Sequence, residues 1–487
     1  MAYWFLDGVT LYLVITYVIS FLISIAIIFL ERKNPSATLA WLMVLFILPG
    51  IGILLYLFLS QNISRLKISH LNKKERRLIG AQLREQSEEI RRGDFPFVRP
   101  EAEKWKDLIL MNQNLGGSFF TQDNKAVFFN DGKEKFDSLF RDLRMASESI
   151  NIMYYIVRND ELGQELISLL TRKAREGVQV RFLLDALGSR GVFPRTLAEF
   201  ADAGGKYAFF FPPKLKYLNM RLNYRNHRKL VIIDNEIGYI GGFNVGQEYL
   251  GKKKKFGYWR DTHMRATGHC VQDMNARFLL DWRFASGESV EVAQAYYDQQ
   301  PVRSGSTGVQ IISSGPDTGR EESMHCYLKM INNAKERIFI QTPYFVPDPS
   351  ILDALMNAVH SGVDVRIMIP CMPDHMFVYW ATWHYAGTLL GAGARVYVYQ
   401  NGFLHAKTLT VDGEVGAVGS TNFDIRSFRL NFEASAVLYD KEEVSRLDAL
   451  FMADAELSTV TTFEEYQGRP LWMKFKESVC RLLSDLL

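Results

Sequence analysis

The sequence predicts an α/β protein in which one domain is built twice, behind an N-terminal pair of transmembrane helices. Three observations predict this fold class. Two apolar stretches of at least 20 residues without a charge open the chain. After residue 125, short apolar runs alternate with segments of helical periodicity, and their order repeats in the second half. We therefore expect two duplicated domains, each a mixed sheet flanked by helices, and an N-terminal transmembrane helical hairpin.

The first 60 residues are expected to anchor the protein in a membrane. Leu11–Leu30 and Ala37–Leu59 carry no charge, and each is long enough to cross a hydrocarbon core about 30 Å thick. Because Pro49-Gly50 interrupts the second stretch, a kink or a shallow re-entrant hairpin is the alternative to a second complete crossing. A cleaved signal peptide is disfavoured, since the first eight residues contain no Lys or Arg and a second apolar stretch follows.

Basic residues predict the orientation of this anchor. Six of them follow the second stretch, against two in the link between the stretches, so the positive-inside rule places the large C-terminal part in the cytoplasm. With two crossings, Met1 lies on the same side. The six residues are Arg65, Lys67, Lys73, Lys74, Arg76 and Arg77.

The rest of the chain divides into a charged segment without a chemical motif and the two repeats. We expect a membrane hairpin over residues 1–60, a linker or helical segment over 61–125, and domains over 126–303 and 304–487. The repeat extends well beyond a single motif. Its matching segments are Ala146–Ile152, Tyr154-Tyr155 and Gly177–Arg181 in the first half, and Ala334–Ile340, Tyr344-Phe345 and Gly362–Arg366 in the second.

Composition excludes some classes of function. The formal charge of the 487 residues is only +3, whereas a dedicated nucleic-acid binder shows a markedly basic domain or face. The four cysteines are scattered without a C-x-x-C pair, so neither a zinc site nor a disulfide framework is indicated, and a reducing compartment is expected.

Each half contains the same polar motif, H-x-K-x4-D, six residues, G-[GS]-x-N. His and Lys lie two apart at the start of an apolar run that reads as a buried strand, so they share a face and can reach one ligand. The Gly-rich segment after the Asp lets backbone approach a bound group, and the Asn amide offers N–H donors. The motif residues are His227, Lys229, Asp234 and Asn244 in the first half, and His405, Lys407, Asp412 and Asn422 in the second.

Such a pair of motifs predicts phosphodiester transfer. Two imidazoles supply a nucleophile and an acid, and two ammonium groups supply positive charge where a pentacoordinate phosphorane accumulates negative charge. A buried ammonium without an anion is costly, so Lys229 and Lys407 are expected to bind one. No metal or other cofactor is expected, because a Lys two residues after the His would repel a bound cation.

These residues resemble the phospholipase D superfamily, whose mark is two His-Lys-Asp motifs. The segments Asn34–Trp41 and Leu48–Gly52 narrow the resemblance to bacterial cardiolipin synthases, over nearly the whole chain. It implies two phospholipase D-like domains whose motifs meet at a pseudo-twofold interface in one active site. It also implies transfer of a phosphatidyl group from one phosphatidylglycerol to another through a phosphohistidine, giving cardiolipin and glycerol. The expected partners are phosphatidylglycerol and anionic membrane lipids, without nucleic acid; an oligomer is not indicated.

The resemblance also assigns roles to the motif residues. It implies that His227 is the nucleophile and that His405 is the acid that protonates glycerol and then the base for the incoming hydroxyl. Asn244, Asn422 and Ser420 are expected to hold the phosphate. The sequence departs from the family at Gly242, which stands where the second half has Ser420.

The carboxylates have two expected tasks. By resemblance, Asp261 and Glu433 bond to the histidine of the opposite half and fix its tautomer, with Glu248 as the alternative to Asp261. Asp234 and Asp412 are grouped with the catalytic residues as motif members. They also stand where a strand enters a turn, a place at which Asp commonly accepts backbone N–H groups.

Other readings of the motif pair stay open. A phospholipase D-type hydrolase would give the same intermediate to water, and a related synthase would use another phospholipid as donor. A nuclease and a non-catalytic lipid-binding protein are further alternatives. Membrane spans and near-neutral charge argue against the nuclease, and intact motifs argue against the non-catalytic lipid-binding protein.

Three apolar segments have softer interpretations. Phe209–Pro213, followed by Lys214, Lys216, Arg221 and Arg225, is either a loop that dips into an anionic bilayer or an ordinary packed loop. We expect Phe377, Trp380, His384 and Gly387 to form a core stripe. The stripe at the C-terminus is expected to pack on the second domain rather than on a membrane. Its residues are Leu471, Phe475, Val479, Leu482, Leu483 and Leu486.

Overall fold

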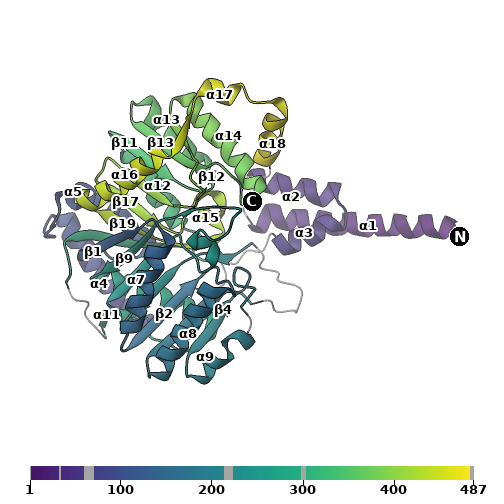
Figure 1. Cartoon of the computed structure of the whole chain (residues 1–487). Coiled ribbons are helices and arrows are strands. Elements are labelled where there is room, and N and C mark those ends of the chain that lie inside the picture. Colours follow the sequence, from purple (N-terminus) through teal and green to yellow (C-terminus); the bar gives the residue numbers. More distant parts are fainter. Residues whose placement is uncertain are drawn as a thin grey trace.

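The computed structural model describes residues 2–31, 35–59, 68, 71–192, 194–212, 223–297 and 303–482. These form a large body of sheets and helices, from which the N-terminal helices project to one side (Figure 1). Several residues singled out above lie outside the described residues. They are Arg65, Lys67, Pro213, Lys214, Lys216, Arg221, Leu483 and Leu486.

The first apolar stretch forms one long helix, α1 (Ala2–Ala26), continued by the π-helical turn η1 (Ile27–Glu31). Within it, residues 8–29 have a mean hydropathy of 2.6. Among the described residues, this is the one helix that is long and apolar enough to cross a membrane.

The second apolar stretch is divided into two short helices, α2 (Pro35–Ile47) and α3 (Ile51–Leu59). The break falls at Pro49-Gly50, where Gly50 has a φ of +84° that favours glycine. The rings of Trp41 in α2 and Tyr56 in α3 meet edge to face at 5.4 Å, so α3 folds back along α2. The pair also packs on α1, because Ser20 Oγ donates to the Leu45 carbonyl at 3.2 Å. The second predicted span is therefore not a single long helix.

Strands from both halves join in one large sheet. Its order is β20-β14-β13-β11-β16-β17-β19-β10-β1-β9-β7-β6-β2-β3-β4, and β5 pairs with β19 beside this path. The order from β4 to β1 in the first half recurs from β14 to β10 in the second, and β1 and β10 meet as antiparallel neighbours in the middle. In the first half β2, β3 and β4 are parallel to one another, and in the second half β11, β13 and β14 are. The strand next to each set, β6 or β16, pairs in the antiparallel sense. This arrangement confirms two α/β repeats with mixed sheets.

The elements of the first half are β1 (Thr121–Phe129), α7 (Gly132–Met145), β2 (Ser149–Tyr154), α8 (Glu161–Arg175), β3 (Gln179–Asp185), η2 (Pro194–Leu197), α9 (Ala198–Asp202), β4 (Lys206–Phe210), β5 (Arg225–Asn226), β6 (Leu230–Ile233), β7 (Ile237–Gly241), η3 (Gln247–Leu250), β8 (Trp259–Arg260), β9 (His263–Thr267), α10 (Cys270–Ser286) and α11 (Gln294–Tyr297). Those of the second half are β10 (Thr307–Ser314), α12 (Glu322–Asn333), β11 (Arg337–Gln341), β12 (Phe345–Val346), α13 (Pro349–His360), β13 (Asp364–Pro370), α14 (Met376–Ala392), β14 (Arg395–Tyr399), β15 (Phe403–Leu404), β16 (Thr408–Val411), β17 (Val415–Gly419), β18 (Phe423–Asp424), α15 (Ile425–Arg429), β19 (Asn431–Tyr439), α16 (Lys441–Glu456), β20 (Ser458–Thr461), α17 (Phe463–Gln467) and α18 (Leu471–Leu482).

Four helices begin for the same physical reason. Asp131 precedes α7, Asp160 precedes α8, Asp348 precedes α13 and Asp440 precedes α16, and each carboxylate accepts a backbone N–H of the first turn. These caps satisfy donors that a helix leaves unpaired at its start, and a negative charge also suits that end of the helix dipole.

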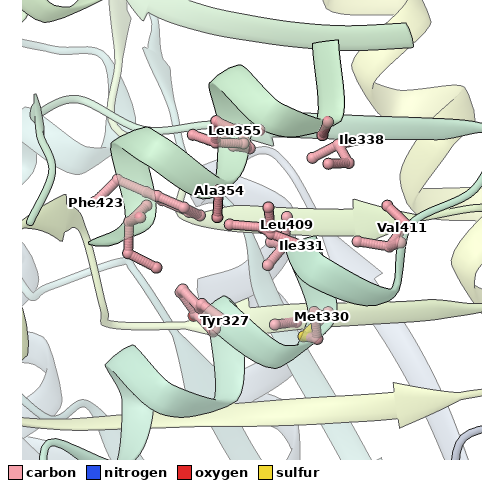
Figure 2. Close-up of a cluster of buried hydrophobic side chains, with 14 of the residues drawn as sticks. Tyr327, Met330, Ile331, Ile338, Ala354, Leu355, Leu409, Val411 and Phe423 are labelled. Atoms are coloured by element: carbon pink, nitrogen blue, oxygen red, sulfur yellow. The ribbon is translucent and has the colours of Figure 1, made fainter. Parts of the chain in front are cut away.

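The cores lie between the sheet and its helices, and a further core joins the halves. In the second half, side chains of α12 and α13 face those of β11 and β16 (Figure 2). The labelled residues there are Tyr327, Met330, Ile331, Ile338, Ala354, Leu355, Leu409, Val411 and Phe423. Between the halves, Ile240 and Met264 of the first share one buried cluster with Val418, Ala434 and Ala436 of the second. Burial of this apolar surface holds the two halves together.

The segment predicted as a linker is packed against the second half. Its helices are α4 (Lys73–Arg92), α5 (Pro100–Lys104) and α6 (Lys106–Gly116). Trp105 and Leu108 are buried in the same cluster as Met330 of α12. Strand β1 begins at Thr121, ahead of the predicted boundary at 126.

Candidate active site

The two motif histidines follow short strands that cross between the halves. His227 lies between β5 and β6, and His405 between β15 and β16. Strand β5 runs parallel to the start of β19, and β8 runs parallel to β15. The N–H of His227 donates to the Phe432 carbonyl at 2.9 Å, and that of His405 donates to the Arg260 carbonyl at 2.7 Å. This exchange brings both histidines to one pocket of about 570 Å³.

Each histidine contacts a carboxylate of the opposite half. Nδ1 of His405 lies 2.6 Å from Asp261 Oδ2, and Nδ1 of His227 lies 2.9 Å from Glu433 Oε2. These are the cross-half pairs expected from the sequence. A carboxylate accepts a hydrogen bond, so it fixes the proton on Nδ1 and leaves Nε2 of a neutral ring with a lone pair.

Glu248, the alternative partner of His405, lies elsewhere in the pocket wall. Its carboxylate accepts from Arg158 Nη2 at 3.1 Å and from Lys253 Nζ at 2.9 Å. Its charge is therefore engaged by two cations, and Asp261 is the group that contacts His405.

Burial and mutual repulsion lower the pKa values of the four cationic groups in the motifs. Burial lowers the pKa of Lys229 to about 7 and that of Lys407 to about 8, and the charge of Lys407 lowers the pKa of Lys229 further. Burial also lowers the pKa of His227 to about 4, against the pull of Glu433, and lowers that of His405. Both imidazoles are therefore neutral at pH 7. A phosphate anion among them would favour the charged forms of all four groups.

The lysine side chains lie beside the motif histidines. Lys229 Nζ donates to the carbonyl of His227 at 2.6 Å and lies over the ring of Tyr155. Lys407 Nζ donates to the carbonyl of His405 and lies 2.9 Å from its Nδ1. Both ammonium groups are buried, which makes an anionic ligand favourable there.

Two of the three predicted phosphate ligands line the pocket. Asn244 and Asn422 both do so. Asn244 Oδ1 accepts the N–H of Ile156 at 3.1 Å, which directs its amide group. Ser420 has a different task from the predicted one: its hydroxyl donates to Glu433 Oε2 at 2.5 Å, so its single proton is already used.

Asp234 and Asp412 are placed away from the catalytic pocket, contrary to their grouping with the catalytic residues. Asp234 accepts the N–H groups of Ser147, Glu148 and Ser149 at 2.7–2.8 Å. Asp412 likewise accepts the N–H groups of Lys335, Glu336 and Arg337 at 2.8–3.0 Å. Both residues have positive φ, 51° and 55°, at the turn after the motif strand. Their observed role is to hold that turn against the start of β2 or β11.

The departure at Gly242 has a steric cause. A Cβ at this position would lie 1.9 Å from Asp261 Oδ1, far inside contact distance. The corresponding Ser420 in the second half instead bonds to Glu433. The two halves thus hold their carboxylates in different ways, and a serine at residue 242 would displace Asp261.

Sequence reasoning missed aromatic neighbours of both imidazoles. The ring of Tyr155 meets that of His227 edge to face at 5.0 Å, and the ring of Trp259 lies 5.1 Å from that of His405. The contact of Tyr155 with His227 could have been suspected from the sequence, because the Tyr154-Tyr155 pair recurs as Tyr344-Phe345 in the second half. No motif pointed to Arg158 and Arg426, which also line the pocket.

Comparisons with known proteins agree with this geometry. A family described as "Cardiolipin synthase, PLD-like domain" matches residues 139–275 and 327–455, and one described as "Phospholipase_D-nuclease N-terminal" matches residues 18–61. The major cardiolipin synthase of Bacillus subtilis is 49% identical over 476 residues, which cover 97% of this chain and 98% of that one. The cardiolipin synthase of Oceanobacillus iheyensis is 48% identical over 481 residues, which cover 99% and 100%.

A solved structure shows the same fold at low identity. The phosphatidylserine synthase of Haemophilus influenzae Rd KW20 superposes with a TM-score of 0.60 at 14% identity, covering 80% of this chain and 100% of that one. The paired motifs and the cross-half contacts agree with relatives that are 48–49% identical over almost the whole chain. The chain therefore belongs to the cardiolipin synthase family of the phospholipase D superfamily.

Proposed function

We propose that this protein transfers a phosphatidyl group from one phosphatidylglycerol to a second, giving cardiolipin and glycerol, through a phosphohistidine on His227. Cardiolipin synthase activity follows from the family, since the relatives named above carry that description over almost their whole length. One observation supports the route. Two imidazoles, each with Nδ1 against a carboxylate of the opposite half, meet in one pocket, and a buried lysine lies beside each of them.

The first half-reaction forms the intermediate. Nε2 of His227 attacks the donor phosphorus, the P–N bond forms, and the bond from phosphorus to the glycerol oxygen breaks. The imidazolium of His405 gives its proton to that oxygen, so glycerol leaves as a neutral alcohol. His405 gains its proton when the phosphate anion enters, because the anion opposes the burial that lowers its pKa.

The second half-reaction reverses these roles. His405, now neutral, removes the proton from a glycerol hydroxyl of the second phosphatidylglycerol. The resulting oxygen attacks the phosphorus, and the bond to His227 breaks. Lys229, Lys407, Asn244 and Asn422 hold the phosphoryl oxygens in both steps.

The first test identifies the products. Purified protein with phosphatidylglycerol in detergent micelles should release glycerol and cardiolipin without added nucleotide or metal. His227→Ala and His405→Ala should each abolish turnover, and the double variant should lose no more, because neither half holds a complete nucleophile and acid. Phosphatidic acid as the only lipid product would support the hydrolase instead, and turnover of labelled DNA alone would support a nuclease.

The second test assigns the histidines. Protein mixed rapidly with radiolabelled phosphatidylglycerol, quenched without acid and digested, should carry label on the peptide that contains His227. Neutral His227 suits a nucleophile, because an imidazole with a pKa of about 4 keeps its lone pair at pH 7. Label on the His405 peptide alone would reverse the assignment.

We place the catalytic body on the cytoplasmic side of a cell membrane, anchored by α1. The basic residues after the apolar stretches support this orientation. Two complete crossings, the arrangement expected from the sequence, would put Met1 on the cytoplasmic side as well. The return of α3 along α2 favours the alternative of one crossing by α1 and a re-entrant hairpin that enters and leaves on the cytoplasmic side.

A further inference from the structure

Helix α18 presents an apolar face to solvent instead of to the second domain. Leu471, Phe475 and Leu482 are 82%, 70% and 71% exposed, and Trp472 and Val479 are exposed beside them. At 100° per residue these five positions form one continuous stripe. The prediction that this stripe packs on the second domain is therefore wrong for its described residues.

The opposite face of α18 carries a polar contact with the turn before the helix and a small apolar contact with the body. Glu477 is buried and receives two hydrogen bonds from Arg469, at 2.5 and 2.9 Å. Cys480 is buried in a cluster with Val346 and Ala381. The Cys480 cluster holds this face against the body, so the apolar stripe on the other face is held towards solvent.

Basic residues border the apolar stripe. Lys474 and Arg481 lie along one edge and Lys476 along the other, by helical position. Lys476 Nζ lies 4.3 Å from the centre of the Trp472 ring. An apolar face bordered by lysine and arginine, with a tryptophan at the edge, is the composition of helices that lie in the headgroup layer of anionic membranes.

This apolar surface continues to the mouth of the catalytic pocket. The ring of Trp472 lies 6.2 Å from that of Trp380 on α14. One turn earlier in α14, Met376 and Phe377 are exposed and also line the pocket. Phe377, predicted as part of a core stripe, is therefore a surface residue at the entrance.

The apolar surface of α18 also lies on the side of the molecule where the N-terminal helices are found. In Figure 1, α18 (yellow) lies on the side of the catalytic body from which α1, α2 and α3 (purple) project. A membrane crossed by α1 therefore lies on the side of the body where α18 is found. The exposed patch thus lies on the anchored side of the molecule, which selects a lipid surface as its occupant over a protein partner.

We propose that α18, together with the first turn of α14, is a second membrane contact, which lies in the headgroup layer of an anionic bilayer and holds the mouth of the pocket against it. This contact deepens the proposed function, because a lipid substrate then enters the pocket directly from the bilayer. It also explains why an enzyme already anchored by α1 keeps an exposed apolar helix far along the chain.

The contact can be tested by measuring immersion. Nitroxide labels are attached to the full-length protein at Phe475→Cys and, as a control, at Met145→Cys, with Cys371→Ser in both. Met145 is 77% exposed at the end of α7, so it matches Phe475 in exposure. In vesicles that contain phosphatidylglycerol, the label at 475 should collide preferentially with oxygen, which dissolves in the bilayer, and the label at 145 with a water-soluble nickel chelate. Preference for the chelate at both sites, or shielding from both reagents at 475 as in a protein contact, would overturn the proposal.

Activity gives a second, independent measurement. Phe475→Glu should lower cardiolipin synthesis on vesicles about tenfold, the effect of losing one buried aromatic side chain, and should leave the rate in detergent micelles unchanged. Met145→Glu should leave both rates unchanged. An equal loss of the Phe475→Glu rate in micelles would mean a folding defect, and the collision measurement on the nitroxide labels would then decide the proposal. A wild type without transfer in either medium would defeat the proposed function but leave the label result standing.

Discussion

At the scale of single residues, the two halves of the site are related but not equal. Glu433 receives hydrogen bonds from Ser420 and Asn431 as well as contacting His227. Asp261, beside His405, occupies the space that a side chain at residue 242 would fill. This difference in support gives the two imidazoles different surroundings, which suits one nucleophile and one acid.

Gly242→Ala tests the steric part of this argument. The added methyl group would overlap Asp261 Oδ1, so the carboxylate must move and His405 loses a charge-assisted hydrogen bond worth about 1.5–3 kcal/mol. We expect kcat to fall about tenfold to a hundredfold, while the protein still folds, with a thermal midpoint in detergent only slightly below that of the wild type. Gly191→Ala, where a Cβ meets nothing closer than 4.0 Å, should leave kcat unchanged. Wild-type kcat in Gly242→Ala would refute the coupling.

The pH profile tests the charge states of the imidazoles. The pKa of His227 is lowered from 6.5 to about 4, so the ring loses its lone pair only as the pH falls towards 4. We expect kcat/KM to persist through pH 6 and 5, where an ordinary histidine would be mostly protonated. At the alkaline end, the rate should fall above about pH 7 as Lys229 loses its charge, and further above about pH 8 as Lys407 does. Half-maximal kcat/KM near pH 6.5 on the acid side would contradict the neutral nucleophile.

At the scale of secondary-structure elements, the motif strand has opposite functions at its two ends. Its start places the histidine in the pocket with the lysine beside it, and its end places an aspartate against the backbone of the neighbouring strand. Asp234 accepts three backbone N–H groups from the start of β2, and Asp412 does the same at β11. The aspartate of the motif therefore stabilises the fold.

Asp234→Ala tests whether the end of the motif strand has a structural function alone. Three N–H groups lose their acceptor, which should lower the free energy of unfolding by about 2 kcal/mol. The kcat of the folded protein should stay within about twofold of wild type at low temperature. His227→Ala should behave oppositely, with no turnover and an almost unchanged thermal midpoint. Loss of kcat in Asp234→Ala at an unchanged midpoint would restore a catalytic role.

At the scale of the whole molecule, the pocket exists only where the halves meet. Each half supplies the strand that supports the other's histidine, and the shared apolar core holds both in register. The anchor then sets how this body meets the membrane. With one crossing by α1, the chain ends on opposite sides of the bilayer.

The topology can be measured with tags in intact cells. A cysteine-bearing tag fused before Met1 should react with a membrane-impermeant reagent from outside, and one fused after Leu487 should react only after lysis. The reason is that α2 and α3 fold back on each other, which leaves α1 as the one crossing in the proposed topology. Protection of both tags would support two complete crossings instead.

The amino-acid sequence by itself determined the repeat, the two His-Lys pairs and the family. These depend on short spacings, because residues two apart on a strand share a face wherever that strand lies. Pairing of Asp261 with His405 and of Glu433 with His227 was expected from the family resemblance, since no local pattern links positions more than 140 residues apart.

Tertiary structure decided the remaining points, each for a physical reason. Ser420 and the two motif aspartates have short-range signals that fit either a ligand-binding role or a contact within the protein, and only the positions of the neighbouring strands select the second. The path of the chain after Pro49-Gly50 depends on what α2 meets, and α1 supplies that surface. The stripe on α18 has the same periodicity whether it packs inward or faces a membrane, and the packing of Cys480 against Val346 and Ala381 turns it outward.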